Sequence, residues 1–287
     1  MEVTKERYAI VTGSNKGIGL ATVKQLASHG IKVLLTARDS KRGFEALQEL
    51  KHSGISHDLV SCHQLDVTDS ASIASLVDFV RIQFGRLDIL VNNAAILGVI
   101  MDEPVGSTIN PAELIQTDEL AEKCLKTNYY GAKETTEAFL PLLQLSDSPT
   151  IVNVSSQAGS LNGISNKCAK EVLDDAENLT DYRIDEVLRE FKKDFKEGCL
   201  ESKGWPMYGS AYKVAKAALN AYTRLVAIKY PNVCVNCVCP GSVITDLTRK
   251  TGSLSVEQGA YSVVKLALLP PGSPSGLFYV RQHVSTF

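Results

Sequence analysis

Three side chains in the sequence have the types and the spacing for acid–base chemistry at a carbonyl group. Tyr212 and Lys216 are four positions apart in a helical pattern, so both side chains leave the same face of a helix. Ser156 follows the apolar run 150–155. Reduction of a ketone requires a hydride at carbon and a proton at oxygen. A phenol can donate that proton if a nearby ammonium lowers its pKa, and a serine hydroxyl can bind the oxygen as negative charge develops.

A glycine-rich turn near the start of the chain predicts a dinucleotide site. The stretch TGSNKGIG lies between the apolar run 8–11 and the helical pattern 19–27. Glycines permit a tight turn and a close approach of the pyrophosphate, whose charge meets the helix N-terminus. Glycine turns also close helices onto sheets, so this spacing alone is weak evidence. The turn residues expected at the cofactor are Gly13, Asn15, Lys16, Gly17, Ile18 and Gly19.

The end of the second apolar run, 31–36, indicates which dinucleotide is preferred. Folds that prefer NAD place an acidic residue there for the ribose 2′-hydroxyl. This chain has Ala37 and Arg38, and an arginine can stack on adenine or pair with a 2′-phosphate. Lys16 and Arg42 could bind the same phosphate, although each of them alone could equally be an ordinary charged side chain in contact with solvent. The three cations together predict NADP(H).

These motifs together resemble the short-chain dehydrogenase/reductase family, from Tyr8 to about Val280. A Tyr-x-x-x-Lys pair is common by itself, and its meaning comes from the preceding serine and glycine turn. The run 92–95, Asn-Asn-Ala-Ala, adds to the resemblance and has Ala95 where glycine is usual. The stretches 36–39, 41–43, 204–206 and 266–270 resemble the monomeric carbonyl reductases and the plant salutaridine reductase and menthone reductase (neomenthol dehydrogenase) group.

The resemblance implies roles for further residues. Ser156 rather than Ser155 is the catalytic serine, and the alternative, a serine capping a helix, suits Ser155 better than Ser156. Asn128 carries a water that links the lysine to solvent. The implied catalytic residues are Asn128, Ser156, Tyr212 and Lys216. The implied cofactor residues, besides the glycine turn and the cations, are Asp66, Val67, Asn93, Tyr212, Lys216, Val243 and Thr245.

The pattern of elements predicts an α/β fold with a doubly wound, Rossmann-like parallel sheet. Near-continuous apolar strands alternate with helical stretches, which is typical of a sheet covered on both faces. The expected strands are 8–11, 31–36, 59–66, 88–92, 150–155, 234–239 and 277–280, and helices are expected at 19–27, 41–52 and 70–84. No stretch resembles an interdomain linker, so residues 1–287 are expected to form a single domain.

An insertion of about 157–207 precedes the catalytic tyrosine. Within it, residues 179–195 have helical spacing of apolar side chains, which fits a helix packed on its own domain better than a partner-binding helix. In the resembled group such an insertion covers the helix used elsewhere for dimerisation, which implies a monomer. The insertion, residues 98–111 and the stretch after Thr245 are expected to cover the substrate. Candidate lining residues are Val99, Ile100, Met101 and Trp205.

Composition limits the partners. The 287 residues carry a net charge of −2 without a polybasic run, so neither nucleic acid nor a membrane is an expected partner. Seven cysteines and no apparent export signal predict a cytoplasmic protein with reduced thiols. The cluster Cys234–Cys239 could bind a metal, but no second pair of ligands lies nearby. A buried strand with thiol side chains fits better, and no metal is expected.

The sequence therefore predicts NADPH-dependent reduction of a ketone on a hydrophobic small molecule, such as a plant terpenoid or alkaloid. One alternative is reduction of the carbon–carbon double bond of an enone. A member of the resembled group that does this lacks the tyrosine, whereas Tyr212 is present here. The other alternative is an NADP-binding protein without catalysis, against which the complete set of site residues argues. The pattern names neither the substrate nor the stereochemistry of the product.

Overall fold

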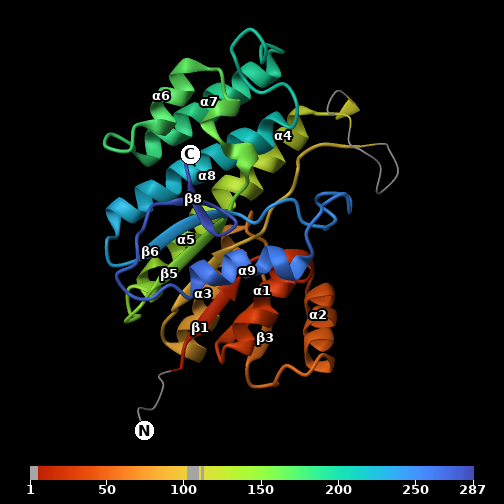
Figure 1. Ribbon diagram of the computed structural model, residues 1–287, viewed down its shortest axis with the longest axis vertical. Helices are drawn as coiled ribbons and strands as arrows, with labels where there is room; N and C mark the ends of the chain where they lie inside the picture. Colours follow the sequence, from red (N-terminus) through yellow and green to blue (C-terminus); the bar gives the residue numbers. More distant parts are fainter. Residues whose placement is uncertain (1–5, 102–109, 111–112) are drawn as a thin grey trace.

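A single eight-stranded sheet organises the chain (Figure 1). The computed structural model describes residues 6–101, 110 and 113–287. The strand order is β3-β2-β1-β4-β5-β6-β7-β8, with every neighbouring pair parallel except the antiparallel β7–β8 pair. The strands are β1 Tyr8–Val11, β2 Lys32–Ala37, β3 Val60–Gln64, β4 Ile89–Asn92, β5 Thr150–Val154, β6 Cys234–Cys239, β7 Phe278–Val280 and β8 His283–Ser285. This order confirms the predicted doubly wound sheet. The chain builds outward from β1 to β3 on one side of the sheet and from β4 to β8 on the other, so the switch point lies between β1 and β4.

Helices cover both faces of the sheet, as predicted. They are α1 Gly17–Ser28, α2 Ser40–His52, α3 Ser70–Phe84, α4 Asp118–Leu125, α5 Gly131–Leu143, α6 Lys167–Asp174, α7 Asp181–Lys196, α8 Ser210–Lys229 and α9 Val256–Ala267. Alternate residues of β1 enter different cores: Ile10 joins a cluster with α3, α5 and α8, whereas Val11 joins one with α1, α2 and α9. This alternation follows from the two-residue period of a strand.

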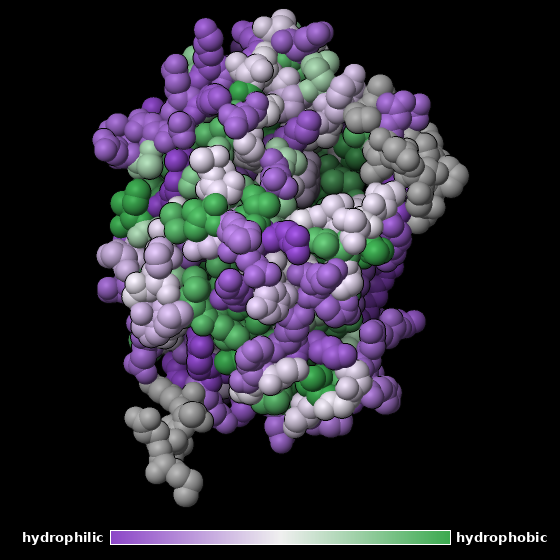
Figure 2. Space-filling view, viewed as in Figure 1, coloured by the Kyte–Doolittle hydropathy of each residue, from purple (hydrophilic) through white to green (hydrophobic). Residues whose placement is uncertain are grey.

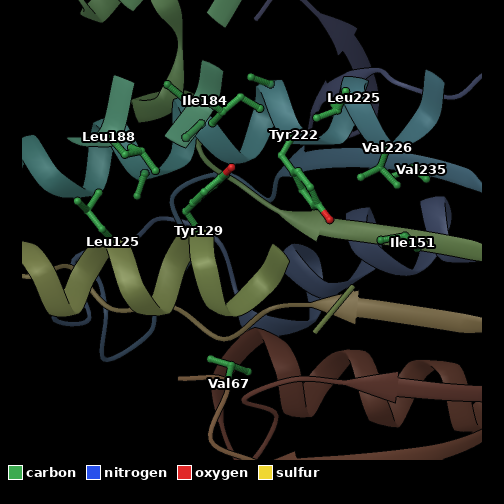
Figure 3. Packing of buried hydrophobic residues seen from close by; sticks show 14 of the residues in the cluster. Val67, Leu125, Tyr129, Ile151, Ile184, Leu188, Tyr222, Leu225, Val226 and Val235 are labelled. Carbon is green, nitrogen blue, oxygen red and sulfur yellow. The ribbon is translucent and has the colours of Figure 1, made fainter. Parts of the chain in front are cut away.

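The insertion before Tyr212 forms α6 and α7, which lie beside α8 at one end of the molecule (Figure 1). The apolar face of α7 is buried, as expected for a helix packed on its own domain: Ile184, Leu188 and Phe191 each have no exposed surface. Figure 3 shows Leu125 and Tyr129 pointing toward this face of α7. The insertion thus extends the core that α4 and α8 share.

Surface features agree with the composition. On the face drawn in Figure 2, hydrophobic side chains are scattered between hydrophilic ones. Among the helices of the described residues, none is long and apolar enough to cross a membrane. The cysteine-rich run forms β6, in which Cys237 and Cys239 are buried, so the prediction of a buried strand is confirmed.

Candidate active site

A cavity of about 900 Å³ lies where the carboxyl ends of the central strands meet. This is the topological switch point of the sheet, where open α/β folds bind ligands. The cavity is lined by the glycine turn, residues from 93 to 101, the end of β5, one side of α8 and the segment after β6. Segments distant in the sequence are therefore joined around one hollow, and nearly all of them follow a strand.

The glycine turn has the geometry that a pyrophosphate requires. Gly13 adopts a φ of +59°, and a Cβ there would lie 2.9 Å from the Cα of Ala94. A Cβ on Gly19 would lie 2.5 Å from Nδ2 of Asn93, so larger residues do not fit. Helix α1 begins directly after Lys16 without a side-chain cap. Its first N–H groups therefore remain available to an anion.

Asn93, predicted to bind the cofactor, holds the glycine turn in place. Its Nδ2 donates to the carbonyl oxygens of Thr12 at 2.8 Å and Gly13 at 3.0 Å. Its backbone N–H and that of Ala94 both donate to the hydroxyl of Thr12. Asn93 and Ala95 also line the cavity. A direct contact of Asn93 with the cofactor stays a prediction.

The three cations predicted for the 2′-phosphate are all exposed. Arg38 follows β2, and Arg42 lies in the first turn of α2. The neighbouring carboxylate, Asp39, caps α2 by accepting from the backbone N–H of Arg42 at 3.0 Å. Lys16 instead pairs with Asp246 at 2.7 Å, a partner that the sequence did not indicate. This group of cations and the glycine turn fit NADP(H).

Ser156, Tyr212 and Lys216 meet at one side of the cavity, because α8 runs past the end of β5. The ammonium of Lys216 lies 5.7 Å from the centre of the Tyr212 ring and donates to the carbonyl oxygen of Val154 at 2.7 Å. Lys216 is only 2 % exposed, and this burial lowers its pKa to about 8. The sequence therefore placed these three residues together correctly, while their catalytic roles stay predictions.

The pKa of Tyr212 shifts in the direction opposite to the one expected. Burial raises the pKa of the phenol above 10, and its hydrogen bond with Ser156 only partly opposes this. Lys216 was expected to lower that pKa, but desolvation of the phenolate outweighs any such effect. The correction suits reduction, because a phenol must be protonated before it can donate to a carbonyl oxygen.

Ser156, and not Ser155, is the serine that caps a helical turn. Ser156 caps the short turn Gln157–Gly159 by accepting from the N–H of Ala158 at 3.1 Å. The hydroxyl of Ser155 donates to Oδ1 of Asn220 at 2.6 Å and is buried. The cap was expected to suit Ser155 better, and that expectation is wrong. Accepting one hydrogen bond leaves the hydroxyl hydrogen of Ser156 free to donate.

Asn128 lies in a π-helical turn, Lys126–Tyr130, between α4 and α5. Its side chain binds the backbone of Ile96 twice: Oδ1 accepts from the N–H at 2.9 Å, and Nδ2 donates to the carbonyl oxygen at 2.8 Å. Ile96 lines the cavity. Turns of this kind are frequent at functional sites. Asn128 therefore fixes one wall of the cavity, and its predicted role in carrying a water stays a prediction.

Two of the residues predicted to bind the cofactor, Asp66 and Val67, are not among those that line the cavity. Asp66 accepts at Oδ1 from the N–H and the hydroxyl of Thr68, at 2.9 and 2.7 Å. Val67 is buried and packs close to Gly131, where a Cβ would lie 2.8 Å from it. Their contacts with the cofactor stay predictions, and in the structure both residues shape the loop after β3.

Val243 and Thr245 line the cavity, where a nicotinamide carboxamide is expected. Thr248 fixes the turn that carries them: its hydroxyl donates to the carbonyl oxygen of Val243 at 2.6 Å and accepts from the N–H of Thr245 at 3.1 Å. The sequence analysis missed Thr248. A threonine three residues after another is too common a pattern to have indicated it.

The four candidate substrate-lining residues divide into two groups. Val99 and Met101 line the cavity. Ile100 is 46 % exposed, does not line it and pairs instead with Ile115. Trp205 is buried in the core, where its Nε1 donates to Asp194 at 2.8 Å, so its assignment to the cavity is wrong.

The segments predicted to cover the substrate are described only in part. Part of the expected stretch 98–111 lies outside the described residues. Of the insertion 157–207, Gln157 is the one residue that lines the cavity. Covering of the substrate by the insertion therefore stays a prediction.

Comparisons with known proteins agree with this geometry. Residues 7–169 match the family described as short chain dehydrogenase, and residues 199–267 match the family described as Enoyl-(Acyl carrier protein) reductase. A (+)-neomenthol dehydrogenase from Arabidopsis thaliana is 54% identical over 98% of both chains. The solved structure of salutaridine reductase from Papaver somniferum superimposes with a TM-score of 0.90 at 49% identity, covering 96% of this chain and 99% of that one.

A more distant relative bears on the cofactor. The protein named carbonyl reductase [NADPH] 3 from Mus musculus is 38% identical over 98% of both chains. Its name specifies the same dinucleotide that Arg38, Arg42 and Lys16 predict here.

Proposed function

Because this chain belongs to the short-chain dehydrogenase/reductase family and is an NADP-dependent oxidoreductase, we propose that it reduces a ketone to an alcohol. The substrate is a bulky hydrophobic molecule of the plant terpenoid or alkaloid class. The observation that carries the proposal is the convergence of Tyr212, Ser156 and Lys216 on one side of the cavity that begins at the glycine turn.

The shape and lining of the cavity support a hydrophobic substrate. Leu97, Val99, Met101 and Leu247 lie among its lining residues, on the segments after β4 and β6. Burial of apolar surface contributes roughly 25 cal/mol per Å², so such walls favour a ring system over a small polar ketone. The names of two relatives, salutaridine reductase and (+)-neomenthol dehydrogenase, are consistent with this substrate class.

Each residue of the site has a defined task in the proposed mechanism. NADPH, when bound, supplies the hydride. Tyr212 donates its phenolic proton to the carbonyl oxygen, and Ser156 donates a hydrogen bond to the same oxygen as charge develops there. Lys216, with a pKa of about 8, is charged at neutral pH and stabilises the phenolate that the transfer leaves behind. Its bond to the carbonyl oxygen of Val154 keeps the ammonium beside the phenol.

The first experiment follows the loss of NADPH absorbance with a panel of cyclic monoterpene ketones, alkaloid ketones and enones. Products of every active compound are then identified. Formation of an alcohol supports the proposal. A saturated ketone as the product would indicate reduction of the double bond instead. Tight binding of NADPH without turnover of any compound would favour a binding protein.

We also propose that the protein is a monomer, and expect light scattering at micromolar concentration to give the mass of one chain. Helix α7 packs along α8 and α4 and buries Ile184, Leu188 and Phe191 against them. A second subunit would have to displace this buried apolar face in order to dock on α8. A stable dimer mass across a dilution series would contradict the prediction.

A further inference from the structure

One carboxylate joins the two sides of the cavity mouth. Asp246 lies in the segment after β6 and pairs through Oδ2 with Nζ of Lys16 in the glycine turn, at 2.7 Å. Its Oδ1 pairs with Nζ of Lys250 at 2.8 Å. Asp246, Lys16 and Lys250 all line the cavity. The two lysines hold the pKa of Asp246 at about 2, so the carboxylate is charged at any physiological pH.

The same segment is attached on the opposite side as well. Nη1 of Arg249 donates to the carbonyl oxygen of Met101 at 2.7 Å. Arg249 and Lys250 adopt φ values of 51° and 64°, a left-handed conformation that costs of order 1 kcal/mol or more for a residue with a Cβ. The N–H of Lys250 donates to the carbonyl oxygen of Thr245, which closes this turn. Residues 244–251 therefore form a strap fixed at Lys16 and at Met101.

The attachment of Asp246 to Lys16 is exposed and exchangeable. The side chains of Lys16 and Asp246 are 60 % and 53 % exposed, and ion pairs this exposed contribute only about 0–1 kcal/mol. A phosphate dianion accepts stronger hydrogen bonds from an ammonium than a solvated carboxylate does. Asp246 would keep its second partner, Lys250, after losing the first.

We propose that Asp246 moderates the preference for NADP(H) by competing with the 2′-phosphate for Lys16. Binding of NADP(H) transfers Lys16 from Asp246 to the phosphate and thereby releases the strap from the glycine turn. NAD(H) has a hydroxyl in that position and leaves the pair intact. The competition thus lowers the affinity for NADP(H) and links release of the strap to the phosphorylated cofactor alone.

The test is a double-mutant cycle on cofactor affinity, measured by fluorescence titration of NADPH and NADH without substrate at low salt. Asp246→Asn should tighten NADPH binding by about three- to five-fold, the factor that an exposed ion pair allows, and leave NADH unchanged. Lys16→Met should weaken NADPH binding. In the Lys16→Met background, Asp246→Asn should have no effect, because the carboxylate acts through the lysine.

The matched control is Asp78→Asn on α3, an aspartate that pairs with Arg81 at 2.6 Å and is 63 % exposed. It should leave both affinities unchanged. Asp246→Ser, which also removes the charge, should repeat the result of Asp246→Asn.

Three outcomes would overturn the proposal. They are unchanged NADPH affinity in Asp246→Asn, equal tightening of NADH, and an effect that persists without Lys16. Equal tightening of both cofactors would show that Asp246 repels the pyrophosphate in general. The titrations need no turnover, so their result is independent of which substrate the enzyme reduces.

Discussion

Tyr212→Phe will abolish ketone reduction while the protein still binds NADPH. The substitution removes the one atom that donates the proton, and general acid catalysis of this kind contributes roughly 10²- to 10⁴-fold to the rate. Tyr212 lies beside Lys216 on the first turn of α8 and lines the cavity together with Ser156. Because phenylalanine keeps the ring and its packing, the loss should appear in kcat and not in the affinity for NADPH.

The control for that loss is Tyr130→Phe, which removes a hydroxyl from another half-buried tyrosine that does not line the cavity. This variant should keep its activity. Both variants are assayed with the best ketone of the panel, and NADPH binding is titrated in parallel. If Tyr212→Phe kept more than about a tenth of kcat, another acid would have to protonate the carbonyl oxygen, and the proposed mechanism would fail.

The sequence could predict those parts of the site that rest on short-range patterns. Tyr212 and Lys216 share a helical face, and the glycine turn lies between a strand and a helix, so both can be found within a few residues of sequence. The central strands were predicted to within a few residues at their ends because they are apolar on both faces. Strand β8 and helices α4, α5, α6 and α9 were not predicted. Strand β8 and helix α6 have only three and eight residues, too few to establish a period by themselves.

Contacts across the cavity could not be predicted in the same way. Asp246 meets Lys16 from 230 positions away, in a loop without regular secondary structure. Trp205 looked like a pocket residue because it is aromatic and lies in the insertion, yet Phe191 and Asp194 of α7 enclose it. Whether Trp205 lines the pocket or lies in the core depends on how α7 packs, which its sequence neighbours do not reveal.

The pKa values of Tyr212 and Lys216 also depend on packing. From the sequence, an ammonium next to a phenol suggests that the phenol pKa falls. The structure buries both groups at the end of β5, and burial acts against the charged form of each one. The phenol therefore stays protonated more readily, and the ammonium gives up its proton more readily, than in water. The raised pKa keeps the phenol in the protonated form that can donate to substrate, whereas the lowered pKa brings Lys216 nearer to losing the charge that stabilises the phenolate.

Lys216→Met will change the pH dependence of stability as well as activity. The folded protein holds this lysine with a pKa of about 8, below the ordinary value of 10.5 that applies to the unfolded chain. Between these values the unfolded chain binds more protons, so the stability of the natural protein rises with pH. From about pH 7 to pH 9.5 the lysine should add roughly 2 kcal/mol to the free energy of unfolding.

In Lys216→Met that rise should be absent, and Tyr212 does not disturb the comparison because its raised pKa lies above this window. Urea unfolding of both proteins across the window measures the difference, with Lys126→Met, an exposed lysine on the turn before α5, as the control. Ketone turnover should fall together with the slope, because methionine cannot stabilise the phenolate. Parallel stability curves for the natural protein and Lys216→Met would mean that the buried ammonium is fully compensated by its bond to Val154. The lysine would then act in catalysis through its charge, with no penalty for its burial.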